Sequence, residues 1–318
     1  MTSTAAAPAG RRSDGTRTAA VLVNPAAARG RGARDVPAVV ATLRSAGLAV
    51  TEITAPGPAE AADACAAAVA AGLDALVAVG GDGTVHLAVQ AVAGTGTALG
   101  VVPAGTGNDL AAALGVPPDP VRAAAEVARR MLAGETVGID AVRTTGADGT
   151  TAGWWACVLA AGFDSAVNER ANRMRWPRGP RRYDVAILAE LARLRPRDYH
   201  LTLDGVAHDL RGVLVAVGNT DSYGGALRIC PAADPTDGLL DVTVVGPVSR
   251  SQLIRVKPRL YSGTHVDHPL VSVYRAAEVR IEAPGITAYA DGERLGPLPL
   301  TLTCVPGALT VLAPGHRS

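Results

Sequence analysis

Short apolar runs alternate with helix-like stretches from Ala19 to Leu114. The apolar runs predict buried strands over Ala19–Val23, Leu48–Ile53, Ala75–Val79 and Leu99–Val102. The stretches that follow them predict helices over Asp35–Ser45, Glu60–Ala71, Thr84–Ala93 and Asp109–Leu114. Repeated strand–helix units with short apolar strands are typical of an α/β fold with a parallel, doubly wound sheet.

The pattern changes after about residue 140, where Asp-Gly pairs become frequent. They lie at 148–149, 204–205, 237–238 and 291–292, between β-like runs such as Leu214–Val217 and Leu240–Val245. Asp-Gly between such runs predicts tight hairpins. One helix, over Tyr183–Leu194, interrupts the strands. We therefore expect this half to be a mostly antiparallel β-sandwich.

The predicted domain organisation has three parts. Residues 1–18 are mostly Ala, Ser, Thr, Gly and Arg and lack the apolar core of a signal peptide, and we expect them to form a disordered tail. A nucleotide-binding α/β domain is expected over 19–142 and a β-sandwich domain over 143–304. The last apolar run, Ala308–Leu312, leaves open whether residues 305–318 return to the first domain.

The charge balance argues against nucleic acid as a partner. Thirty Lys and Arg residues against 29 Asp and Glu residues give a net charge of +1, whereas nucleic-acid-binding proteins usually carry a clear basic excess. The four cysteines are scattered without a C-x-x-C pair, so neither a zinc site nor a disulfide framework is indicated. No window approaches the roughly 18 uncharged apolar residues of a membrane-spanning helix. A cytoplasmic protein fits these features.

The sequence Gly80-Gly81-Asp82-Gly83-Thr84 joins a predicted buried strand to a predicted helix. Glycines permit a sharp turn and the close approach of an anion to the main chain. The helix that follows directs free N–H groups and its positive dipole end toward the turn. A carboxylate beside a phosphate needs a cation between them, which points to Mg²⁺. Taken alone, an ordinary Gly-rich turn with a surface aspartate explains these residues equally well.

Two further turns of similar composition follow predicted strands. Residues 103–109 read PAGTGND, and residues 24–28 read NPAAA. Ligands of open α/β sheets bind at the carboxyl ends of the strands, so three such turns predict a polyphosphate-binding edge. The chain has neither a GxxxxGK[ST] P-loop nor a GxGxxG fingerprint after a strand, which excludes the standard P-loop and NAD-type Rossmann sites.

Three motifs together resemble the catalytic domain of the diacylglycerol kinase family, which includes sphingosine, ceramide and bacterial lipid kinases. They are Asn24-Pro25, GGDGT at 80–84 and PAGTGND at 103–109. GGDGT alone is moderately specific, since NAD kinases and phosphofructokinases have a similar loop. The resemblance extends over roughly residues 19–313 through motifs of the second half. These motifs are Gly162-Phe163-Asp164, Gly218-Asn219, the stretch from Pro231 to Asp241, and Asp291-Gly292-Glu293.

The resemblance implies a nucleotide-binding α/β domain, a β-sandwich domain, and ATP in the cleft between them. It implies that Asp82 organises the catalytic Mg²⁺ through water, in a network with Asp140 and Asp291, and that Glu293 is the general base. Asp234, Asp237 and the Leu239 carbonyl would hold a second, structural Mg²⁺. The implied ATP-binding residues are Asn24, Pro25, Ala26, Ala27, Ala28, Thr54, Gly80, Gly81, Asp82, Gly83, Thr84, Val85, Gly105, Thr106, Asn108 and Asp109.

The first turn departs from the family pattern. Ala28 stands where the family often has Gly or Ser, with Gly30 two residues further on. The phosphate contacts of this loop are therefore left open.

The residues of the second half also admit plainer interpretations. From spacing alone, Asp291-Gly292 is a hairpin turn and Glu293 a solvated strand residue, and Asp234 and Asp237 stabilise a turn by side-chain hydrogen bonds. A glutamate with an ordinary pKa of about 4.3 is a weak base, which suffices for a loose transition state in which the proton moves late. The family pattern favours the catalytic interpretation of Glu293.

A basic stretch from Arg170 to Arg197 holds nine arginines, with Met174, Trp176 and Tyr183 among them. Such a segment suits contact with anionic lipid headgroups, where each basic residue adds about 1 kcal/mol. A solvated helix face and loop is the plainer interpretation, slightly favoured by charge pattern alone.

The expected reaction is the transfer of the ATP γ-phosphate to a lipid hydroxyl, with diacylglycerol as acceptor and phosphatidic acid as product. A sphingoid base or a ceramide stays open as the acceptor. An NAD kinase shares GGDGT, but the DGxLD and DGE motifs argue against it, and the presence of Asp82 and Glu293 argues against a non-catalytic binder. We expect peripheral, transient contact with a membrane surface, and a homodimer stays open.

Overall fold

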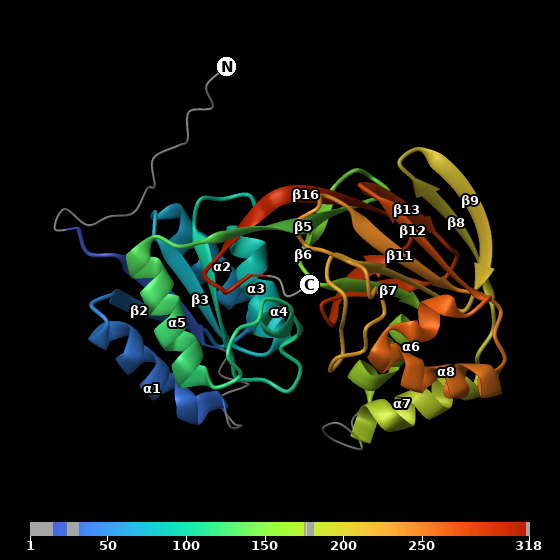
Figure 1. Ribbon diagram of the computed structural model, residues 1–318, viewed down its shortest axis with the longest axis horizontal. Coiled ribbons are helices and arrows are strands. Elements are labelled where there is room, and N and C mark those ends of the chain that lie inside the picture. The colour runs from blue at the N-terminus through green and yellow to red at the C-terminus, as the bar shows by residue number, and fades with distance from the viewer. Residues whose placement is uncertain (1–14, 24–31, 175, 177–180, 316–318) are drawn as a thin grey trace. The chain divides into compact units, whose positions relative to one another are not determined.

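The computed structural model describes residues 15–23, 32–174, 176 and 181–315. The chain divides into two compact units, Met1–Ile139 together with Gly307–Ser318, and Asp140–Pro306. Elements of both units are labelled in Figure 1.

A four-stranded parallel sheet forms the centre of the N-terminal unit. Its strands are β1 (Thr18–Val23), β2 (Ala49–Thr54), β3 (Ala75–Gly80) and β4 (Ala98–Pro103). They lie in the order β2-β1-β3-β4, and every neighbouring pair is parallel. All residues of β3 and β4 are buried, as expected for central strands covered on both faces. The predicted parallel α/β fold is confirmed.

Helices cover both faces of this sheet. They are α1 (Gly32–Ser45), α2 (Pro58–Ala70), α3 (Asp82–Val92), α4 (Asp109–Ala113) and α5 (Pro120–Ala133). One core cluster joins α1 and α5 to alternate strand residues such as Val21 and Val77. The intervening residues, such as Leu22 and Leu76, are also buried and face the opposite side, where α2 and α3 pack together.

Helix α5 is absent from the sequence-based expectations. It begins at an Asp119 N-cap, whose carboxylate accepts a hydrogen bond from the Arg122 amide at 2.8 Å, with Pro120 at the first helical position. It ends at Gly134, which adopts a φ of 70° in the left-handed region.

The last strand, β16 (Leu300–Val311), contributes its end to the N-terminal unit. Val311 pairs with Leu99 in parallel, and the Leu312 amide donates to the Leu99 carbonyl at 2.9 Å. Leu309, Val311 and Leu312 are buried. The final apolar run therefore belongs to the N-terminal unit.

The C-terminal unit contains two packed β layers. One is an all-antiparallel sheet in the order β12-β11-β10-β7-β14-β15, and the other includes β5, β6, β8, β9, β13 and the first part of β16. The bounds are β5 (Val137–Gly146), β6 (Thr151–Trp155), β7 (Val158–Gly162), β8 (Arg197–Leu203), β9 (Val206–Gly212), β10 (Leu214–Gly218), β11 (Leu240–Val245), β12 (Val271–Ala276), β13 (Glu278–Glu282), β14 (Thr287–Ala290) and β15 (Glu293–Pro297).

One core holds these two layers together. It includes Trp155, Tyr199 and Leu302 from one layer and Val215 and Val242 from the other. The buried Trp155 indole donates to the Thr144 hydroxyl at 2.9 Å, which satisfies its only polar atom. The predicted β-sandwich is thus present.

Three of the four Asp-Gly pairs form hairpin turns. The pairs at 148–149, 204–205 and 291–292 join β5 to β6, β8 to β9 and β14 to β15. The hairpin prediction is wrong at 237–238, because β10 ends at Gly218 and the pair lies in the long segment before β11.

The C-terminal unit has more helix than the sequence predicts. Around the expected helix, which is α7 (Arg181–Ala192), the described chain also forms α6 (Phe163–Arg173), α8 (Arg250–Ser262) and a short 3₁₀ turn at Thr264–Asp267. The expectation of one helix is wrong because α6 and α8 consist mostly of polar and charged residues, whereas α7 contains the apolar run Val185–Leu188. None of the helices in the described part of the chain has the length and apolar content needed to cross a bilayer.

Candidate active site

The GGDGT and PAGTGND motifs lie next to each other at the carboxyl ends of β3 and β4. Gly80 is the register partner of Pro103 in the parallel pair, and the Ala104 amide donates to the Gly80 carbonyl at 2.9 Å. Thr54 ends β2 and pairs with Val23, so it lies at the same edge with its side chain exposed. The predicted segment Asn24–Ala28 lies outside the described residues.

Asp82 connects the two motifs. Its Oδ2 accepts a hydrogen bond from the Asn108 amide at 3.1 Å, and its Oδ1 accepts one from the Asp109 amide at 2.7 Å. Helix α3, which begins at Asp82, therefore supplies the carboxylate that accepts hydrogen bonds from the backbone amides at the start of α4. A carboxylate is also the kind of oxygen ligand to which a hydrated Mg²⁺ binds.

The PAGTGND loop is shaped by Asn108. Asn108 has a φ of 64°, and its side chain both accepts from the Gly105 amide at 3.1 Å and donates to the Gly105 carbonyl at 3.0 Å. Asparagine adopts this left-handed conformation more readily than most residues. Gly105 and Thr106 are exposed at the tip of the loop.

Glycine is required where the two loops touch. A Cβ on Gly105 would lie 2.4 Å from the Gly81 Cα, and a Cβ on Gly107 would lie 1.9 Å from the Asp82 Oδ2. A Cβ on Gly80 would lie 2.3 Å from the Oγ1 of Thr84. The result is a surface of backbone at the start of α3, which fits the close approach of a phosphate.

Other predicted residues of the first loop are buried. The Thr84 side chain is 2% exposed and that of Val85 is 5% exposed. Their backbone amides both donate to the Gly81 carbonyl, at 2.9 Å from Thr84 and 3.1 Å from Val85, so these two residues shape the turn and leave ligand contacts to their neighbours. Gly83 lies beside them in the first turn of α3.

In the C-terminal unit, Asp140 and Asp291 take part in one hydrogen-bond network through Asn219. Asp140 is 2% exposed, and its Oδ2 accepts from the Gly238 amide at 2.7 Å. The buried Asn219 amide group donates to the Asp140 carbonyl at 3.0 Å and to the Ala156 carbonyl at 2.8 Å. Asp291 accepts from the Ala156 amide at 3.0 Å.

Asp291 also positions the DGE turn. Besides Ala156, it accepts from the Cys157 amide at 3.0 Å, so both carboxylate oxygens are bound to backbone. Asp291 and Gly292 have φ angles of 52° and 82°, as required of a tight two-residue hairpin turn. Glu293 begins β15 directly after this turn and is exposed. A carboxylate on a fixed turn and open to solvent can accept a proton from an incoming hydroxyl.

The predicted metal-binding turn is held by hydrogen bonds within the chain. Asp234 Oδ1 accepts from the Thr236 hydroxyl at 2.6 Å, and Asp237 Oδ1 accepts from the Leu239 amide at 2.9 Å. Asp237 also pairs with Arg275. Across the part of the chain that the structure describes, no three His, Cys, Asp or Glu side chains form a metal-like group. The structural Mg²⁺ stays a prediction.

Asp241 is a buried charge that sequence reasoning left without a role. It is 1% exposed, its Oδ2 lies 3.3 Å from the Nε of Arg275, and its Oδ1 is buried without a hydrogen-bond partner. Burial raises the pKa of Asp241, and Arg275 opposes that rise. Asp241 is the last residue of the DGLLD motif that begins at Asp237. Its place in that motif is the sequence signal by which it could have been found.

Asp164 in the GFD motif is a second residue without an assigned role. It lies in the first turn of α6, and the Tyr223 hydroxyl donates to its Oδ2. Burial raises the pKa of Asp164 to about 7. Its charge therefore changes near neutral pH, in contrast to an ordinary aspartate.

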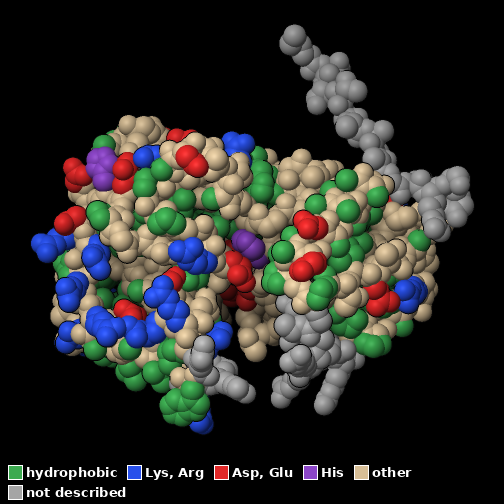
Figure 2. Space-filling model, turned by 180° about the vertical axis from the view of Figure 1, so that it is seen from behind, with side chains coloured by type: hydrophobic (Ala, Val, Ile, Leu, Met, Phe, Trp, Pro, Cys, Tyr) green, Lys and Arg blue, Asp and Glu red, His purple; other side chains and the backbone are tan. Residues whose placement is uncertain are grey.

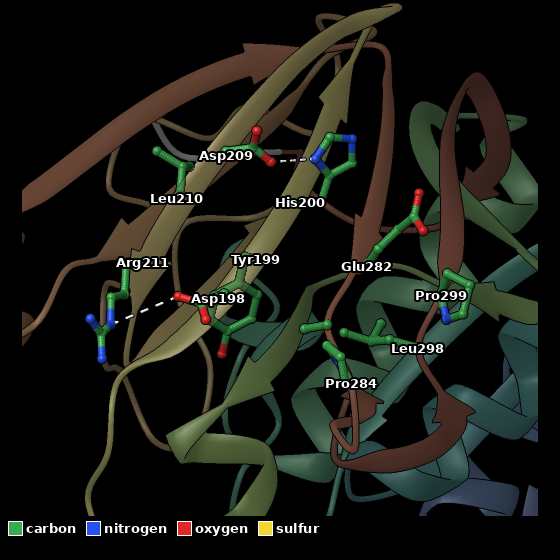
Figure 3. Close-up of a pocket in the computed structure, with 11 residues that line it drawn as sticks. Asp198, Tyr199, His200, Asp209, Leu210, Arg211, Glu282, Pro284, Leu298 and Pro299 are labelled. Carbon is green, nitrogen blue, oxygen red and sulfur yellow. Dashed lines mark hydrogen bonds and ion pairs between the residues drawn. The ribbon is translucent and has the colours of Figure 1, made fainter.

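Two cavities of the described chain lie away from these residues. One, of 670 Å³, lies against the β8–β9 hairpin and is lined by the His200–Asp209 pair, Tyr199 and Pro299 (Figure 3). A second, of 380 Å³, lies beside α6 and α7 and is lined by Arg193, Arg195 and Arg197 among others. Neither cavity is lined by a predicted catalytic or nucleotide-binding residue.

Comparison with known proteins gives the same picture as these motifs. Residues 18–144 match the model of the diacylglycerol kinase catalytic domain, and residues 157–313 match that of the YegS C-terminal NAD kinase β-sandwich-like domain. The chain is 46% identical over 296 residues to the diacylglycerol kinase of Mycobacterium tuberculosis, which covers 93% of this chain and 94% of that protein. The chain belongs to the diacylglycerol kinase family.

More distant relatives agree. The chain is 31% identical over 256 residues to a YegS-like lipid kinase of Stenotrophomonas maltophilia, covering 76% of this chain and 80% of that protein. A crystal structure of a diacylglycerol kinase from Bacillus anthracis superimposes with a TM-score of 0.68 at 20% identity, covering 93% of this chain and 96% of the other. At that identity the superposition shows that the fold is shared.

Proposed function

We propose that this family member is an ATP- and Mg²⁺-dependent kinase that phosphorylates the free hydroxyl of diacylglycerol to give phosphatidic acid. The observation that carries the proposal is the joining of the GGDGT and PAGTGND loops by Asp82, across a contact that only glycine permits. The diacylglycerol kinase of Mycobacterium tuberculosis, 46% identical, supports the choice of acceptor.

The N-terminal unit has the residues to hold the nucleotide. When bound, ATP supplies the phosphoryl group and Mg²⁺ offsets its negative charge. The backbone amides of Gly83, Thr106 and Gly107 bind the phosphate oxygens. Thr54 contributes from the end of β2, and residues 24–28 contribute from the segment that follows β1 in sequence. Asp82 holds the hydrated cation through its carboxylate.

The C-terminal unit supplies the acid–base group. Glu293 accepts the proton of the lipid hydroxyl while the lipid oxygen forms its bond to the γ-phosphorus and the bond from that phosphorus to the bridging oxygen of ADP breaks. Asp291 fixes the turn that carries Glu293, and Asp140 supports Asp291 through Asn219. Asp234, Asp237 and the Leu239 carbonyl are the proposed ligands of a structural Mg²⁺.

A lipid substrate requires contact with a bilayer surface. The helical side of the C-terminal unit gathers Lys and Arg side chains, visible at the lower left of Figure 2. Within the basic stretch, Trp176 is 82% exposed and Leu188 is 66% exposed. Exposed apolar residues among arginines support peripheral, reversible attachment to anionic lipid.

The test offers the purified chain radiolabelled ATP and Mg²⁺ with mixed micelles of diacylglycerol, sphingosine or ceramide, and with NAD in a parallel reaction. We expect label in phosphatidic acid and its loss on chelation of Mg²⁺. Phosphorylation of NAD alone would overturn the lipid assignment. Absence of Mg-ATP binding by calorimetry would overturn the kinase assignment altogether.

A further inference from the structure

Helix α8 (Arg250–Ser262) lies on the surface of the C-terminal unit without burying any side chain fully. Its N-terminus is closed by a capping box, in which Ser249 and Gln252 bond each other's backbone amides, and it ends at Gly263 with a φ of 75°. These signals define a helix that is stable at both ends although it adds little to the core.

The helix is attached to the unit along one side. Leu253, Val256 and Leu260 are half-buried and recur three or four residues apart, which places them on one face. The Leu260 carbonyl accepts from the Arg228 amide at 2.8 Å, and Arg250 donates to the Ala192 carbonyl at the end of α7. Figure 1 shows α8 and α7 together on this side of the unit.

The outward face carries an apolar stripe. Ile254 is 58% exposed, Tyr261 is 54% exposed, and Pro258 is exposed between them. Their spacing of four and three residues aligns them along the helix, opposite the attached face. Solvent-exposed apolar side chains in a continuous row indicate a surface that is covered in use.

Cations border this stripe on both sides. At the helical spacing, Arg250 and Lys257 follow one edge of the stripe, and Arg255 and Arg259 follow the other. The helix contains no acidic residue. Among the described residues, Arg255, Lys257 and Arg259 form no ion pair within the chain. Their charge is therefore available to an external partner.

We propose that α8 is an interfacial helix that lies flat on an anionic phospholipid surface. Ile254, Pro258 and Tyr261 enter the boundary between headgroups and acyl chains, while the four cations contact lipid phosphates. A second copy of the chain is a poor occupant, because a symmetric contact would oppose two cationic helices. The inference rests on the proposed function, in which the substrate is taken from a bilayer.

The experiment is co-sedimentation of the full chain with vesicles of phosphatidylcholine alone or with about one third phosphatidylglycerol. The wild type should bind the anionic vesicles and release them at high salt. Two double variants should each weaken that binding at least about tenfold. One combines Ile254→Ser with Tyr261→Ser, and the other combines Lys257→Glu with Arg259→Glu. Both variants keep the attached face intact, and an unchanged melting temperature checks their folding.

Matched controls come from equally exposed positions elsewhere. Val121→Ser with Leu132→Ser alters exposed apolar residues of α5, and Arg122→Glu with Arg143→Glu reverses two exposed cations. These variants should bind vesicles like the wild type. If they lose binding as strongly as the α8 variants, overall charge and apolarity explain the attachment and the role of α8 is overturned.

Three further outcomes test this inference, and they distinguish its failure from that of the proposed function. If Leu188→Ser with Arg193→Glu abolishes vesicle binding while the α8 variants bind normally, α8 is not the docking surface although the membrane attachment stands. Kinase activity toward short-chain diacylglycerol in detergent should be unchanged in the α8 variants. Its absence in the wild type, with vesicle binding intact, refutes the kinase proposal alone. A change of oligomeric state with unchanged vesicle binding indicates a protein contact and overturns the lipid assignment.

Discussion

At the scale of single residues, two aspartates hold hairpin turns in the same way at different places in the C-terminal unit. Asp204 and Asp291 both start an Asp-Gly turn with positive φ, and both accept two backbone amides from a neighbouring segment. The Asp204 turn carries no predicted chemistry. What distinguishes the Asp291 turn is the exposed carboxylate of Glu293 that follows it, so the catalytic proposal depends on Glu293.

Replacing Glu293 with Gln is the direct residue-level test. The exposed side chain keeps its size but cannot accept a proton, so we expect kcat to fall by about 10²- to 10⁴-fold while Mg-ATP binding is unchanged. Steady-state kinetics and calorimetry measure the two effects. Full activity in Glu293→Gln would remove the assignment of the base.

Asp164 gives a pH-dependent prediction. Burial raises its pKa to about 7, whereas an unfolded aspartate has a pKa of about 3.9. The native state therefore holds a proton that the unfolded state has lost between about pH 4 and 7, and the free energy of unfolding falls as the pH rises through this range. In Asp164→Asn this contribution is absent.

The measurement is the melting temperature of both proteins from pH 5 to pH 8. The Asn variant should gain stability relative to the wild type as the pH rises, because the wild type must then bury a charge. Asn still accepts the hydrogen bond from Tyr223, so the comparison isolates ionisation. A difference that stays constant with pH would show that Asp164 titrates normally.

At the scale of elements, the nucleotide edge depends on how closely two βα turns approach. A methyl group on Gly107 would lie 1.9 Å from the Asp82 Oδ2, so the loop and the carboxylate cannot both keep their positions. Such a change acts on the contact between two turns and leaves each strand and helix intact.

Gly107→Ala should therefore weaken Mg-ATP binding by at least about tenfold, since it displaces groups that must be held to within about half an ångström. Gly96→Ala is the control, because a Cβ there meets nothing within 4 Å. Isothermal titration calorimetry compares the two. Equal affinity in both variants would show that the joined loops do not form the phosphate site.

At the scale of the whole molecule, the N-terminal unit is discontinuous in sequence. Residues from Gly307 onward complete it after the chain has formed the entire C-terminal unit. Leu309 and Val311 are fully buried there, next to β4, which carries the PAGTGND loop at its end. The nucleotide edge thus relies on the last strand.

Leu309→Ala should cost about 2–5 kcal/mol of unfolding free energy, as expected for a truncated core leucine. Thr310→Ala, at a half-buried position of the same strand, should cost clearly less. Urea denaturation measures both, and the Leu309 variant should also be rescued in part by Mg-ATP, which stabilises the state that binds it. A loss below about 0.5 kcal/mol would show that this strand is dispensable.

The sequence by itself determined the fold class and the positions of the motifs. Apolar runs of strand length and amphipathic stretches between them are local signals, and they predicted β1 to β4 to within one or two residues at each end. The capping signals of α5 (Asp119-Pro120 and Gly134) and of α8 (Ser249, Gln252 and Gly263) were also present, but the many polar and charged residues of α8 obscure its apolar period.

Only the tertiary structure decided which residues meet. Asp82 accepts hydrogen bonds from Asn108 and Asp109, which lie far from it in sequence. Asn219 likewise connects Asp140 to Ala156. The outward direction of Ile254 and Tyr261 also depends on how α8 packs. Register between strands and packing of helices set these relations. Local patterns specify which element a residue belongs to, whereas its partners follow from how the elements assemble.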